Sequence, residues 1–123
     1  MDKRIVIELI KLFENIKFTE QPEGDETIGY IQDHYRRIQV SFLEDNMGKY
    51  LKLSYVMEIT DGIEEILSNL SSRIVNGRYR MLGNDIILYS IIPILDEKFL
   101  KVQLEHALSE IWDMSTIVNH FKS

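Results

Sequence analysis

The chain has 123 residues and a formal charge of −6, and 45% of its residues are hydrophobic. This is the length of one ordinary domain with enough apolar side chain for a core, so we expect a single domain over residues 1–123. The absence of cysteine excludes disulfide frameworks, thiolate metal sites and cysteine nucleophiles. The charged fraction of 28% is typical of a soluble globular protein rather than of a disordered one.

The first element that the sequence predicts is a helix over residues 2–17, with Asp2 placed to cap its N-terminus. Its apolar residues fall at helical spacing. They are Ile5, Leu9, Leu12, Phe13 and Ile16. The following stretch, 19–27, is polar and contains both a proline and a glycine, so we expect a loop there.

The next segment changes to the two-residue period of half-buried strands. Apolar and polar residues alternate over 38–42 and again over 51–57. The turn between them holds Asn46 and Gly48, residue types that accept a positive φ. We therefore expect a β-hairpin, preceded by a short strand over 28–31.

The second half predicts a helix that starts after Asp61 and stops at Asn76–Gly77. Two short strands follow, over 78–82 and 86–92, joined by a tight turn. A long helix opens at Asp96, and its apolar residues repeat at spacings of four and three. These residues are Leu100, Leu104, Ala107, Ile111, Met114, Val118 and Phe121. Trp112 lies beside this stripe, and we expect it to pack on the sheet rather than in solvent.

The predicted order of elements is α-β-β-β-α-β-β-α. Hairpins imply mainly antiparallel pairing, and this order favours an α+β domain. We expect a five-stranded, mainly antiparallel sheet with the helices packed mostly on one face.

The second half also resembles the YbjN-like family, which is similar in architecture to type III secretion chaperones. The resemblance covers about residues 61–121 and rests on a helix running into Asn76–Arg80, the turn Gly83–Asp85, the strand Ile86–Tyr89, Pro93 and the long closing helix. It implies a small, non-enzymatic fold that holds or senses another protein, often as a dimer. The family carries no catalytic residues to transfer to this chain.

No motif with a catalytic mechanism is present in the sequence. His34, His106 and His120 are dispersed, and the last two stand fourteen positions apart on one predicted helix, roughly 21 Å along its axis. Paired acidic residues fall in loops, turns or first helical turns, where they have a structural reason to be. We expect no catalytic, cofactor-binding or metal-binding residue, no cofactor and no enzyme activity.

Basic residues concentrate in two short segments of the sequence. They are Arg36, Arg37, Arg73, Arg78 and Arg80. Together with Tyr35 and Tyr79 they suggest a surface for single-stranded nucleic acid. The net charge of −6 opposes this interpretation, and we expect arginines paired with neighbouring carboxylates and no nucleic-acid partner.

The strand over 86–92 is apolar on both of its faces, which is the main anomaly of the sequence. If helices cover one face, then Ile87, Tyr89 and Ile91 project from the other, with Tyr35 and Tyr50 as aromatic neighbours. Exposed apolar patches of this kind mark interaction surfaces. The alternative is a strand buried on both sides. We expect the first arrangement, with a polar rim that comes from Arg37, Gln39 and Lys52.

These observations favour a protein-binding, chaperone-like or regulatory module that forms a homodimer and binds another protein. The alternative is a sensory domain that binds a small ligand between the last helix and the sheet, where Ser90 and Arg36 are the inward polar candidates. No signal peptide or membrane span is apparent. We therefore expect a cytoplasmic protein without a membrane partner.

Overall fold

A computed structural model describes residues 1–22, 24, 26–73 and 77–122. The fold is α+β, with three helices and six strands in the described residues. The helices are α1 (Lys3–Leu12), α2 (Ile63–Arg73) and α3 (Glu97–Phe121). The strands are β1 (Lys17–Glu20), β2 (Thr27–Asp33), β3 (Arg36–Asp45), β4 (Gly48–Glu58), β5 (Arg78–Leu82) and β6 (Asp85–Pro93).

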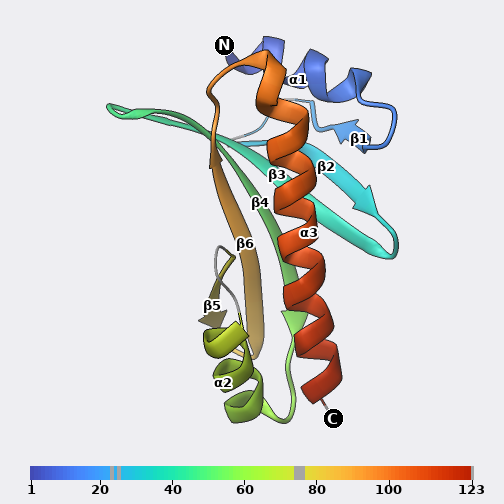
Figure 1. Cartoon of the computed structure of the whole chain (residues 1–123), viewed down its shortest axis with the longest axis vertical. Helices are drawn as coiled ribbons and strands as arrows, with labels where there is room; N and C mark the ends of the chain where they lie inside the picture. The colour runs from blue at the N-terminus through green and yellow to red at the C-terminus, as the bar shows by residue number, and fades with distance from the viewer. Residues whose placement is uncertain (23, 25, 74–76, 123) are drawn as a thin grey trace.

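The six strands form one open antiparallel sheet in the order β1-β2-β3-β4-β6-β5. Strands β3 and β4 make a long hairpin whose tip projects beyond the body of the molecule (Figure 1). Its two-residue turn is closed by Asp45, whose side chain accepts hydrogen bonds from the backbone N–H groups of Met47 and Gly48. Both predicted hairpins are therefore present.

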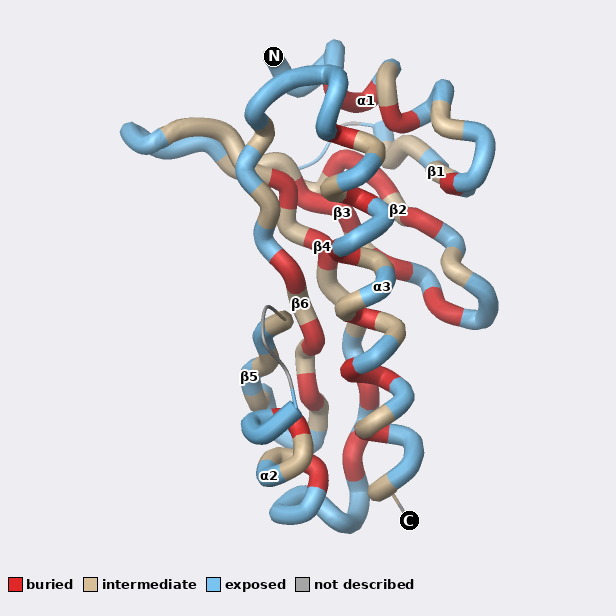
Figure 2. Tube along the Cα trace, in the orientation of Figure 1, coloured by how far each residue is buried: buried red, intermediate tan, exposed pale blue. Residues whose placement is uncertain are grey.

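All three helices lie on the same face of the sheet (Figure 1). The long helix α3 runs along β6 and β4, α2 packs against α3, and α1 packs beside β1. The core lies between the sheet and the helices, as the buried segments in Figure 2 show. Strand residues that point toward the helices include Ile38, Val40, Leu51, Leu53, Ile86 and Leu88, all with at most 1% of their surface exposed.

The five-strand prediction is wrong, because Lys17–Glu20 is a sixth strand where the sequence suggested a helix end and a loop. This segment offers one inward apolar side chain, Phe18, which is too little alternation to predict a strand. It is held by antiparallel pairing with β2 and by ion pairs of Glu20 with α1. Tertiary contacts thus create a strand that local sequence does not encode.

The predicted extent and stripe of the first helix are also wrong. The helix ends at Leu12, and its buried residues are Val6, Ile7 and Ile10, whereas Leu12 is 75% exposed. Apolar residues occur nearly all around this segment, so two stripes compete. The helix is therefore rotated about its axis relative to the prediction. In the observed orientation, Glu8 pairs with Arg4 and Lys11, and Lys11 also pairs with β1.

The closing helix matches its prediction closely. Asp96 accepts a hydrogen bond from the backbone N–H of Phe99 and so caps α3, and Asp2 caps α1 in the same way. Six of the seven predicted stripe residues are buried, and Phe121 is partly buried. Asn76, predicted with Gly77 to stop α2, lies outside the described residues. Among the described helices, none combines the length and apolar character that a membrane crossing requires.

Candidate functional site

The sheet has an open face, which we define as the strand residues that point away from the helices. Directly opposed residues of antiparallel strands share a face. Ile87 opposes Val56, Tyr89 opposes Ser54, and Ile91 opposes Lys52 across β6 and β4. Tyr50 follows on β4 with the same parity, so four of the five predicted interface residues lie on one surface: Ile87, Tyr89, Ile91 and Tyr50.

An apolar band runs along this open face. Val56 is 55% exposed and Ile91 is 40% exposed, and Ile87, Tyr89 and Tyr50 are partly exposed. In the part of the chain that the structure describes, no helix covers them (Figure 1). Apolar surface of this kind on two interior strands of the sheet, β4 and β6, is unfavourable in water, and it is typical of a docking surface.

Tyr35 is not part of the open face, in contrast to the prediction. It lies in the β2–β3 turn against α3, where its hydroxyl accepts a hydrogen bond of 3.0 Å from the side chain of Asn119. Its ring centroid is 6.3 Å from that of Trp112. Strand alternation fails across this turn, because His34 adopts a positive φ of 57° and reverses the chain. Tyr79 also points to the helical side, where its hydroxyl contacts Ser71 of α2.

A second cluster lies on the helical side, around the buried guanidinium of Arg36. The side chain has no exposed surface, donates to Ser115 Oγ at 2.7 Å, and pairs with Asp33 at 3.2 Å. Its Cζ lies 3.5 Å from the centroid of the half-buried Trp112 ring, a cation–π contact. Trp112 was predicted to pack on the sheet rather than in solvent; it is half-buried, and it packs on the β2–β3 turn and on Arg36 at the start of β3.

The small-ligand alternative depended on Arg36 and Ser90 as free inward polar groups. Both have partners within the chain, since Ser90 donates to the Glu110 carboxylate at 2.9 Å. A shallow hollow of about 350 Å³ lies beside the Arg36 cluster. It is lined by Asp33, His34, Leu108, Ser109 and Trp112. Asp33 in this lining pairs with Arg36, which in turn donates to Ser115 of α3, and this favours a structural role for the cluster.

The histidines remain apart, as the sequence indicates. His34 contacts Asp33, and its ring is tilted against that of Trp112 with 4.5 Å between the ring centroids, whereas His106 and His120 lie on α3. Within the described residues, no three His, Asp or Glu side chains gather as a metal site would require.

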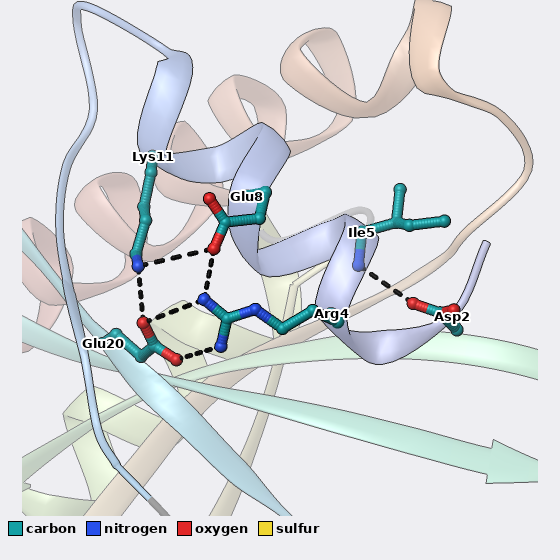
Figure 3. A network of polar contacts seen from close by, with 6 residues as sticks. All are labelled: Asp2, Arg4, Ile5, Glu8, Lys11 and Glu20. Carbon is teal, nitrogen blue, oxygen red and sulfur yellow. Dashed lines mark hydrogen bonds and ion pairs between the residues drawn. The ribbon is translucent and has the colours of Figure 1, made fainter.

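An ion-pair network joins α1 to the edge strand β1 (Figure 3). Glu20 accepts hydrogen bonds from Arg4 and Lys11, and Arg4 also pairs with Glu8. The hydrogen bonds from Arg4 and then Lys11 lower the pKa of Glu20 from 4.5 to about 2. This network fixes β1 against α1 on the helical side of the sheet.

The network predicts acid-sensitive docking of β1. Because the pKa of Glu20 in the folded protein lies below its ordinary value of 4.5, the ionised carboxylate contributes its full stabilisation at pH values above about 4.5. This contribution is lost as the pH falls toward 2. Urea melts at about pH 6 and about pH 3 should show a smaller acid-induced loss for Glu20→Gln than for the wild type. The exposed Glu14→Gln serves as the control. Equal acid sensitivity of wild type and Glu20→Gln would contradict the role of the network.

Comparison with known proteins yields one distant likeness. The chain is 28% identical over 123 residues to the DNA mismatch repair protein MLH1 of Saccharomyces cerevisiae. The match covers all of this chain and 15% of that protein. No family model matches the chain, and no solved structure matches it significantly.

Proposed function

We propose that the chain is a non-enzymatic, protein-binding module of chaperone-like or regulatory type, and that a partner protein docks on the open face of the sheet. The observation that carries the proposal is the apolar band of Ile87, Tyr89 and Ile91, with Tyr50 and Val56 beside it. Large side chains at the centre of a face and polar ones around them match the usual composition of a binding hot spot. The resemblance to the YbjN-like family supports the same class of function.

The competing class of partner is nucleic acid, since the relative named above is a DNA mismatch repair protein. Aromatic and basic side chains do occur together on the open face. The chain as a whole carries a charge of −6, and long-range repulsion from a polyanion opposes such binding. We therefore propose a protein partner, a cytoplasmic location and the absence of a cofactor.

The test is to remove the apolar band without disturbing the core. Tyr89→Ser/Ile91→Ser should keep the circular dichroism spectrum of the wild type, because both side chains point away from the buried residues. It should lose the proteins that the wild type captures, as read by quantitative mass spectrometry of parallel pull-downs. Sedimentation of both proteins reports any homodimer through this face.

Val102→Ser on the exposed side of α3 is the matched control, since Val102 is 50% exposed. It should capture the same proteins as the wild type. A folded Tyr89→Ser/Ile91→Ser variant with unchanged mass and unchanged partners would overturn the proposed function. Loss of folding would show that Tyr89 and Ile91 belong to the hydrophobic core rather than to a docking surface.

A further inference from the structure

The open face differs in charge from the rest of the molecule. Five of the 14 basic residues point from it, and only three of the 20 acidic residues do so within the described strands. The basic ones are Lys17, Arg37, Lys52, Arg78 and Arg80. The acidic ones are Asp45, Glu58 and Asp85, which lie at strand ends. The strands that the structure describes thus put more basic than acidic side chains on this face, in a chain of net charge −6.

Three of these five cations lie directly beside the apolar band. Arg78 opposes Tyr89, Arg80 opposes Ile87, and Lys52 opposes Ile91 in neighbouring strands. The Lys52 Nζ is 5.0 Å from the ring centroid of Tyr89, a contact that holds the ammonium along the sheet. These three positive charges and the apolar side chains therefore form one continuous surface.

The cations of this surface have no ion-pair partner in the part of the chain that the structure describes. Within the residues that the structure describes, none of the five forms an ion pair; the basic groups that do are Arg4, Lys11, His34, Arg36 and Lys101. The sequence-based expectation of arginines paired with carboxylates therefore holds for Arg36 but not for Arg78 and Arg80. Unpaired cations around an apolar centre supply both attraction and orientation for a negatively charged partner.

A second copy of the chain is poorly matched to this face. In a two-fold symmetric contact the same patch meets itself, so Lys52, Arg78 and Arg80 of one copy would face a patch with the same excess of basic side chains. Like charges across an interface oppose association. We infer that the occupant of the open face is a protein segment with acidic residues between apolar ones. This inference deepens the proposed function and rests on it.

The experiment compares two fluorescein-labelled peptides by fluorescence anisotropy. One repeats Asp-Leu-Glu-Phe, and its uncharged counterpart repeats Asn-Leu-Gln-Phe, so they differ in charge alone. The wild type should bind the acidic peptide more tightly, with the difference shrinking as salt is added. Arg78→Gln/Arg80→Gln should weaken binding of the acidic peptide by roughly 3- to 10-fold and leave the neutral peptide unaffected.

Lys98→Gln/Lys101→Gln on α3 removes the same number of positive charges away from the open face and should change neither affinity. Equal affinity of the wild type for both peptides, or no binding of either, would overturn the acidic-partner inference. Acidic-peptide binding that survives Tyr89→Ser/Ile91→Ser would instead contradict the apolar docking face itself. Tighter binding of a single-stranded oligo-dT than of the acidic peptide would assign the face to nucleic acid and overturn the inference.

Discussion

Asp33→Asn is expected to lower the free energy of unfolding by about 2–3 kcal/mol. The substitution removes the carboxylate that pairs with Arg36, whose guanidinium has no exposed surface. An unpaired charge is costly to keep out of water, and breaking a buried pair typically costs about 3–5 kcal/mol. The lower figure applies here because the Asp33 side chain is 18% exposed and water reaches part of this site.

A double-mutant cycle separates the buried charge from simple loss of contact. Arg36→Met keeps the apolar stem against Trp112 but removes the charge, so Asp33→Asn/Arg36→Met should cost less than the two single changes added together. Trp112 is the chain's one tryptophan and reports this site by fluorescence, with circular dichroism as the independent probe. Wild-type stability of Asp33→Asn would mean that the guanidinium does not depend on this carboxylate.

The sequence predicted those elements that encode their own periodicity. Helix α3 repeats apolar residues at helical spacing, and β4 alternates apolar and polar side chains, so their inward residues were predicted correctly. Strand β6 is apolar on both faces, and there the two-residue alternation of side-chain direction separated one face from the other. The same alternation placed Ile87, Tyr89 and Ile91 on the open face. Whether a helix covers that face depends on where the chain turns, and only the structure shows that all three helices lie on the opposite face of the sheet.

The failures have a common physical origin in contacts between distant segments. Arg36 and Arg37 are neighbours in sequence, yet the pleat sends one into the core and the other onto the open face. Arg36 connects Asp33 to Ser115, which are 82 positions apart in the sequence, so no local sequence pattern predicts this cluster. Partial signals existed, namely the inward parity of Arg36 and the position of Trp112 beside the apolar stripe of α3.

Strand β1 forms through contacts with other segments rather than through local β-propensity. Gly29 of β2 is the residue that allows β1 to come close enough for these contacts. A Cβ on Gly29 would lie 2.3 Å from the backbone oxygen of Thr19 and 2.5 Å from the ring of Phe18. Glycine is needed here for close approach of two strands, not for a left-handed conformation. Gly29→Ala should therefore displace β1 from β2 and cost about 1–3 kcal/mol, the usual range for overpacking.

Hydrogen exchange gives the prediction its local readout, because backbone amides of β1 should lose protection while those of β4 and β6 keep theirs. Phe18→Ala should not rescue Gly29→Ala, since the nearest clashing atom belongs to the backbone of Thr19. Gly83→Asn is the matched control: Gly83 has a φ of +62° and open space around it, and asparagine tolerates that conformation at a cost under about 1 kcal/mol. Wild-type protection of β1 in Gly29→Ala would show that this edge strand does not depend on the close approach at Gly29, and that the ion pairs of Glu20 with Arg4 and Lys11 suffice to hold it.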